Sequence, residues 1–129
     1  MLVYLSDDWL EAIQEAADRD EPLRAAWRDA SLSVEQHVTG GPHGEVVFHV
    51  VFGDGSVRFG AGPLDDPDVT ITEPYEVAVA VAQGQASAQA AAMVGQVSVT
   101  GRIDRLQQQA ATFDRLADVF GSVRADTSY

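Results

Sequence analysis

The stretch from Asp68 to Ile103 constrains the fold of this chain more than any other segment. Its two ends, residues 69–72 and 97–100, alternate apolar and β-compatible polar residues, which is typical of half-buried strands. Residues 75–83 and 88–94 lie between these ends and are too apolar for an exposed surface. We therefore predict two strands joined by two short, mostly buried helices.

The second of these helices is rich in alanine. Alanine occupies four of its positions, namely Ala88, Ala90, Ala91 and Ala92. Alanine is an excellent helix former that fills little volume. Such a helix either lets another backbone approach closely or leaves apolar space beside it, and apolar space stays dry and can hold a hydrophobic guest.

Several short motifs lie in and around this stretch. They are DVTIT at 68–72, a helix ending at Gly84, SAQAAAM at 87–93, GQV at 95–97 and VTG at 99–101. In this respect the run from Pro67 to Leu106 resembles the sterol carrier protein 2 (SCP-2) family of lipid-binding domains. The resemblance implies an α+β fold and non-catalytic binding of sterols, fatty acids, fatty acyl-CoA or other lipids, or an accessory role beside enzymes that handle them.

The chain departs from the family pattern at three positions. After the glycine of the GQV motif the family often has Lys or Arg, where this chain has Gln96. After the glycine of the VTG motif it often has Asp or Asn, where this chain has Arg102. It also often has an aromatic residue where this chain has Ala92. These differences concern the ligand rather than the fold.

The N-terminal segment predicts a helix that begins at Asp7. Ser6 can cap this helix through its hydroxyl, and the acidic Asp7 and Asp8 suit its positive end. Apolar residues spaced three and four apart form one face, namely Trp9, Leu10, Ile13, Ala16 and Ala17. Pro22 then opens a short second helix, after which we expect Trp27 to anchor the core.

Three strands follow, and their apolar residues fall on one face. The turn at 40–44 pairs Thr39 with Glu45, which brings the apolar faces of the first two strands together without a slip. Asp54-Gly55 is a strong two-residue hairpin signal that adds a third strand. The opposed pairs are Val38 with Val46, Val34 with Val50, Phe52 with Val57, and Val50 with Phe59.

The C-terminal part predicts one amphipathic helix of about four to five turns that ends at Gly121. Its apolar face is Ile103, Leu106, Ala110, Phe113, Leu116, Ala117 and Phe120. Residues 121–129 are expected to form a loose tail.

The chain as a whole, residues 1–129, should be a single α+β domain with a two-layer architecture. About five mostly antiparallel strands would be covered by helices on one face, and the helical crossover from 69–72 to 97–100 favours one parallel pair of strands.

Charge and composition exclude several partners. Twenty acidic and eight basic side chains give a formal net charge of -12, which repels phosphate backbones and makes nucleic acid an unsuitable partner. The uncharged run from Val77 to Gly101 is interrupted by glutamines and glycines, which favours a buried core and no integral membrane contact. The first residues lack the features of a signal peptide, so we expect a cytoplasmic location.

The candidates for catalysis and metal binding are weak. Glu35, His37 and His49 fall near one another on the predicted hairpin, but on the face away from the core, where polar residues are ordinary. The chain has no cysteine and no nucleophile elbow. We therefore expect neither an enzyme nor a metal site, and no cofactor.

The apolar interior is the remaining candidate site. Its expected lining comes from the sheet and the helices: Phe48, Val50, Phe52, Phe59, Val77, Val81, Ala91, Ala92, Met93, Phe113, Leu116 and Phe120. These residues would form either a plain hydrophobic core or, as the resemblance implies, a cavity for a hydrophobic ligand. The alternative is an interaction module or homodimer in which the alanine-rich helix packs against a partner chain.

Overall fold

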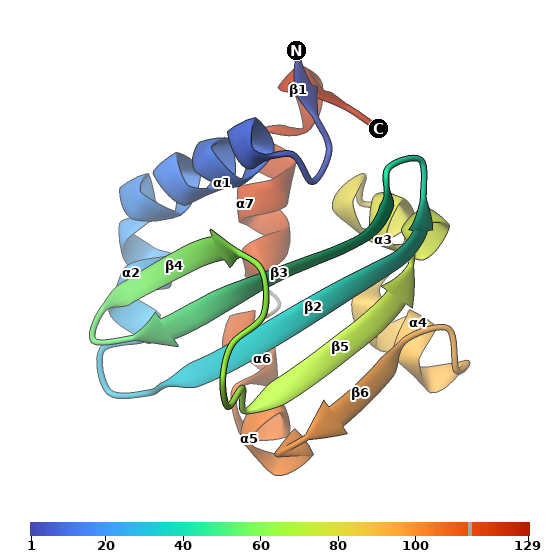
Figure 1. The fold of residues 1–129 in the computed structure, drawn as a ribbon. Helices are drawn as coiled ribbons and strands as arrows, with labels where there is room; N and C mark the ends of the chain where they lie inside the picture. The colour runs from blue at the N-terminus through green and yellow to red at the C-terminus, as the bar shows by residue number, and fades with distance from the viewer. Residues whose placement is uncertain (114) are drawn as a thin grey trace.

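A computed structural model of the chain describes residues 1–113 and 115–129, and the side chains of these residues apart from Ala88 and Gln89. Five strands form one sheet in the order β4-β3-β2-β5-β6, and the helices pack against one face of it, behind the sheet in Figure 1. The sheet strands are β2 (Leu32–Gly41), β3 (Gly44–Gly53), β4 (Ser56–Ala61), β5 (Val69–Pro74) and β6 (Ser98–Gly101). This confirms the predicted two-layer α+β fold.

The helices and the short terminal strands complete the chain. The helices are α1 (Asp7–Arg19), α2 (Glu21–Ala26), α3 (Tyr75–Ala82), α4 (Ala88–Met93), α5 (Ile103–Gln108), α6 (Ala110–Phe113) and α7 (Leu116–Ser122). A 3-10 turn, η1 (Arg124–Asp126), precedes β7 (Thr127–Ser128), which pairs in parallel with β1 (Leu2–Val3). Both termini therefore lie at the same end of the molecule (Figure 1).

The hairpin registers agree with the apolar pattern. All four predicted pairs are present, Val38 with Val46, Val34 with Val50, Phe52 with Val57, and Val50 with Phe59. Asp54 and Gly55 have the positive φ values, 52° and 71°, that a two-residue turn of this type requires. The predicted pairing of Thr39 with Glu45 is wrong, because the register shifts after Val38 and Gly41 pairs with Gly44.

The parallel pair of strands is not the one that the crossover indicated. β2 and β5 run parallel, with Val34 opposite Val69 and Val38 opposite Glu73. β5 and β6, which α3 and α4 connect, are antiparallel. The two helices reverse the chain instead of returning it to the same edge, and the parallel step arises from the longer path through β3 and β4.

The core lies between the sheet and the helices around two tryptophans. Ser6 caps α1 by accepting a hydrogen bond from the backbone N–H of Trp9 at 3.2 Å, as predicted. The Trp9 ring lies 6.1 Å from Phe48 and 5.7 Å from Phe120, measured between centroids. Trp27 is fully buried and stacks on Phe52 at 4.3 Å, which confirms it as a core anchor.

The C-terminal region differs from the predicted single helix and loose tail. The helix is divided into α5, α6 and α7, with a turn at Gln109, while Asp114 lies outside the described residues. The tail is held in place: Thr127 is buried and its hydroxyl donates to the carbonyl of Val123 at 2.6 Å. The Tyr129 ring packs 5.0 Å from that of Tyr4. The two-residue strand β7 could not be predicted from the sequence, because it is too short to show a periodic pattern.

Tyr129→Ala should lower the free energy of unfolding by about 2 kcal/mol, less than a fully buried aromatic would cost because the ring is only half-buried. Urea denaturation measures this change, with Ser128→Ala as the control, since Ser128 is exposed. A loose tail would instead give equal stabilities for both variants and the parent.

Candidate functional site

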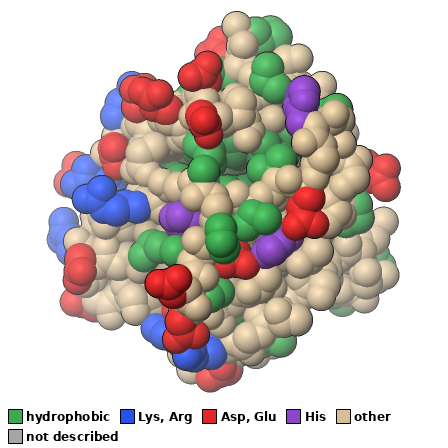
Figure 2. All heavy atoms as spheres, in the orientation of Figure 1, with side chains coloured by type: hydrophobic (Ala, Val, Ile, Leu, Met, Phe, Trp, Pro, Cys, Tyr) green, Lys and Arg blue, Asp and Glu red, His purple; other side chains and the backbone are tan. Residues whose placement is uncertain are grey.

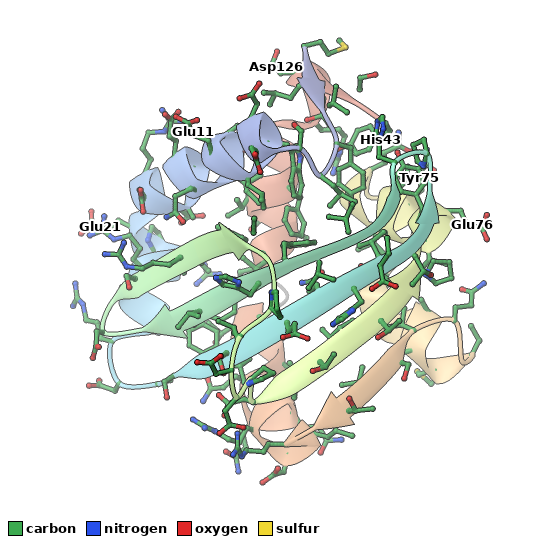
Figure 3. The ribbon with its side chains drawn as sticks, viewed as in Figure 1. Glu11, Glu21, His43, Tyr75, Glu76 and Asp126 are labelled. Atoms are coloured by element: carbon green, nitrogen blue, oxygen red, sulfur yellow. The ribbon has the colours of Figure 1, made fainter. Side chains whose placement is uncertain are left out.

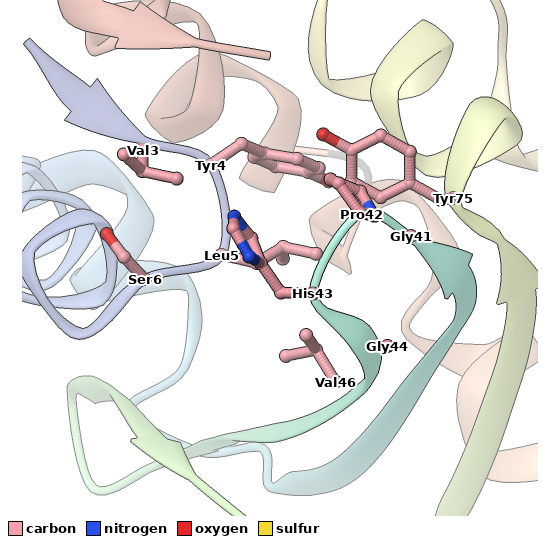
Figure 4. A pocket seen from close by; sticks show the side chains of 10 residues that line it. All are labelled: Val3, Tyr4, Leu5, Ser6, Gly41, Pro42, His43, Gly44, Val46 and Tyr75. Carbon is pink, nitrogen blue, oxygen red and sulfur yellow. The ribbon is translucent and has the colours of Figure 1, made fainter.

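An apolar hollow of about 360 Å³ opens at the end of the molecule that holds the termini (Figure 4). It lies between the segment that follows β1, the tip of the β2–β3 hairpin and the start of α3. Its lining is Val3, Tyr4, Leu5, Ser6, Gly41, Pro42, His43, Gly44, Val46 and Tyr75. Its volume falls within the range of small-molecule sites, which are mostly apolar and concave.

The backbone shapes this hollow at two positions. Leu5 has a φ of 68°, so the chain turns sharply between β1 and α1 and directs this segment over the hairpin tip. Gly41 lies against the ring of Tyr75, where a β-carbon would come within 2.8 Å of a ring carbon. Glycine is therefore required at this position for the ring to lie under the hairpin tip (Figure 3).

Tyr4 forms the inner wall of the hollow. Its ring contacts that of Trp9 edge-on at 4.9 Å and lies 5.9 Å from that of Tyr75. Its hydroxyl donates to the carbonyl of Ala78 at 3.3 Å. Burial, and then the charge of Glu73, raise the pKa of Tyr4, so the phenol remains protonated. Tyr4 thus separates the hollow from the apolar interior.

Glu73 is an acidic residue on the covered face of the sheet. It follows Val69 and Ile71 in the alternation of β5, and it lies opposite Val38. Only 9% of its surface is exposed, and burial raises its pKa to about 7. Among the described residues, none places a hydrogen-bond donor or a cation on its carboxylate. Burial makes the ionised form of this acid costly, and acids with pKa values shifted in this way are concentrated at functional sites.

Most of the predicted lining residues do meet in the interior. Phe48, Val50, Phe52, Ala91 and Leu116 are buried, and Phe59, Val77, Phe113 and Phe120 are half-buried and pack against that core. Val81 is half-buried but is not among the residues that pack against the core. Ala92 is exposed, as is Met93, at 86%. The expectation that these two residues face the interior is wrong, because the short helix α4 turns Ala91 inward and its neighbours outward.

Sequence reasoning did not identify the residues around the hollow. Tyr4 and Leu5 precede the first predicted helix, and Tyr75 begins α3, where no pattern distinguishes a wall of a site from a core residue. Glu73 could have been found, since the alternation of Val69 and Ile71 places it on the apolar face. The period-two alternation in the sequence therefore already indicated an acidic residue at a core position.

A larger groove of about 570 Å³ lies at the other end of β3. Its lining includes the charged residues Arg28, Asp29, Asp54 and Arg58. This mixture of charges on an open surface suits an apolar ligand less well than the hollow beside Tyr4.

Two arginines near the sheet edge are already paired. Asp68 accepts hydrogen bonds from Arg105 at 2.7 Å and Arg102 at 3.1 Å, and from the backbone N–H of Ser33 at 2.9 Å. Arg102 also reaches Asp66 at 3.4 Å. This cluster ties β2, β5 and α5 together, and its cations are engaged with carboxylates of the same chain.

Histidine and acidic side chains lie near one another on the open face of the sheet (Figure 2). His37 lies 2.6 Å from Glu35 and 3.3 Å from Glu45, and its hydrogen bond with Glu35 lowers the pKa of that acid and raises the pKa of the imidazole. Glu35 also accepts from the backbone N–H of Leu64 at 2.8 Å, which fastens the loop before β5. Within residues 1–113 and 115–129, no group of three histidine or acidic side chains is arranged to hold a metal.

The five-stranded sheet with helices on one face defines a small two-layer α+β domain with an apolar hollow at one end. The model of the SCP-2 sterol transfer family matches residues 10–114, and the chain belongs to this family. No curated protein matches its sequence. In the part of the chain that the structure describes, no helix is long and apolar enough to cross a membrane.

Solved structures share the fold at low sequence identity. A conserved hypothetical protein of Thermus thermophilus, described as possibly a sterol carrier protein, is 20% identical with a TM-score of 0.75, over 92% of this chain and 88% of that one. A sterol carrier protein 2 is 19% identical with a TM-score of 0.75, over 91% and 96%. UbiJ-SCP2, a ubiquinone synthesis protein, is 21% identical with a TM-score of 0.60, over 88% of each chain.

Glu73→Gln should remove a pH dependence of stability. Because the pKa of Glu73 rises from 4.5 to about 7 on folding, the parent protein loses stability as pH rises through this window, by about 3 kcal/mol in all. Below about pH 4.5 the acid is protonated in both states and the penalty is absent. The difference in unfolding free energy between variant and parent should therefore grow with pH across the window. Urea titrations over a pH series measure it.

Glu76→Gln is the matched control, since Glu76 is exposed on α3 and points away from the sheet (Figure 3). Its stability should follow the parent within about 0.5 kcal/mol at each pH. A difference between Glu73→Gln and the parent that stays constant with pH would contradict the burial of an ionisable acid.

Proposed function

We propose that the chain binds and carries an apolar small molecule without catalysis. The observation that carries this proposal is the apolar hollow, whose inner wall, Tyr4, packs on the core side against Trp9. Displacement of a single aromatic side chain would join the hollow to the interior between sheet and helices. Membership of the SCP-2 sterol transfer family supports the same role.

The proposed site extends from the hollow into the interior. The sheet would contribute Phe48, Val50, Phe52 and Phe59, and the helices Val77, Val81, Ala91, Phe113, Leu116 and Phe120. Several of these positions carry small or half-buried side chains, which can move apart at less cost than a fully packed core. A sterol, a fatty acid or a similar lipid is the class of ligand that fits such a lining.

The ligand should carry at most one charge. A CoA thioester presents several phosphates, which call for several free cations. Arg102 and Arg105 are engaged by Asp68, and the chain as a whole carries a net charge of -12.

Burial of each methylene contributes about 0.8 kcal/mol, whereas association costs roughly 4 to 15 kcal/mol, so a long-chain lipid should bind with micromolar affinity.

A homodimer formed through α4 is the second candidate. Met93 is 86% exposed and the adjoining Val94 is 73% exposed, on a stretch without charged residues. Exposed apolar patches of this kind often mark interfaces. This candidate needs no internal ligand, and Ala92 lies within the surface that a second copy would cover.

Ala91→Trp should abolish lipid binding while the protein remains folded, because the indole would occupy the space that the guest requires. Displacement of a fluorescent long-chain alcohol probe measures binding, and circular dichroism reports the fold. If Ala91→Trp lost about 1 to 3 kcal/mol of stability and the parent bound no probe, the interior would be a filled core, and this result would contradict the proposal.

Ala92→Trp is the control on the same helix. Its exposed position predicts unchanged lipid binding, whereas a dimer through α4 would dissociate in sedimentation equilibrium. The pair of variants therefore separates the carrier from the dimer.

A further inference from the structure

The proposed carrier function leaves Glu73, an acid on the covered face of the sheet and only 9% exposed, without a role. We propose that Glu73 binds the head group of the ligand, and that this head is a hydrogen-bond donor, an alcohol or an amine, on an otherwise apolar molecule. The inference rests on the proposed function, because it assigns the polar end of the same site.

The register of the sheet places Glu73 in line with the hollow. Val46 lines the hollow, Val46 lies opposite Val38 on β2, and Val38 lies opposite Glu73 on β5. Neighbouring strands are about 4.8 Å apart, so Glu73 lies about 10 Å from Val46 along this row. Tyr4 lines the hollow, and the charge of Glu73 contributes to the raised pKa of its hydroxyl. A chain that enters past Tyr4 would bring its head to Glu73.

The chemistry of the carboxylate determines which heads fit. An ionised carboxylate only accepts hydrogen bonds, so its partner must donate, as a hydroxyl or an ammonium group does. Tyr4 does not fill this role, because its hydroxyl already donates to Ala78. A carboxylate head would place two like charges together in an apolar interior, which is strongly unfavourable.

A buried polar group without a partner also lies against Tyr4. The indole N–H of Trp9 is buried and has no acceptor among the described residues. Trp9 contacts the Tyr4 ring directly. A hydroxyl group both donates and accepts, so a ligand alcohol can bond either to the carboxylate of Glu73 or to this indole N–H.

The test compares three probes that share one alkyl chain, namely dodecanol, dodecylamine and dodecanoate. Binding is measured by calorimetry at about pH 8, where Glu73 is ionised. The parent should bind dodecanol and dodecylamine about tenfold more tightly than dodecanoate, the effect of one hydrogen bond to a charged group. Glu73→Leu should remove this preference, while Glu73→Gln, which keeps an acceptor but no charge, should weaken the amine and retain the alcohol.

Glu76→Gln should leave all three affinities unchanged, because Glu76 is exposed on the outer side of α3. Equal binding of the three probes by the parent and by Glu73→Leu would overturn the role of Glu73 and leave the carrier function standing. No saturable binding of any probe by the folded parent would instead overturn the carrier function itself. Circular dichroism of each variant confirms that a lost affinity reflects the site and not the fold.

Discussion

Burial of the apolar face of the sheet is the interaction on which the rest of the structure depends. Val34, Val50 and Phe52 of the central strands are almost completely inaccessible. Trp27, at the end of α2, packs on Phe52, and Trp9 of α1 packs on the neighbouring Phe48. The opposite face holds Glu35, His37 and His49 and remains open. With helices on one side only, the space between the layers is the place where this domain can enclose an apolar guest.

Polar groups within this layer are therefore informative. Around the sheet edge, Asp68 is fully engaged by arginines and a backbone N–H, so its burial is compensated. Glu73 lies at the other end of β5, where burial raises its pKa. Two acids five residues apart thus differ in role: Asp68 stabilises the fold, and Glu73 costs stability at neutral pH, as expected of a group retained for binding.

The sequence predicted the layers and the hairpin registers because these depend on periodicity. Val38, Val46, Val50 and Phe59 fall in phase along three strands, and a slip of one residue would expose all of them. The parallel pairing of β2 with β5 could not be predicted, since it depends on where a long connection returns. The hollow escaped prediction for a similar reason: Tyr4 and Tyr75 are far apart in the chain and meet only through the tertiary fold.

The position of a bound alkyl chain tests the account most directly. Nuclear Overhauser effects between dodecanol and the protein identify the protons that surround it. The account predicts contacts with Tyr4 at the wall of the hollow and with Phe48 and Ala91 in the interior between sheet and helices. Saturable binding with contacts confined to Met93 and Val94 on the outer surface of α4 would contradict it.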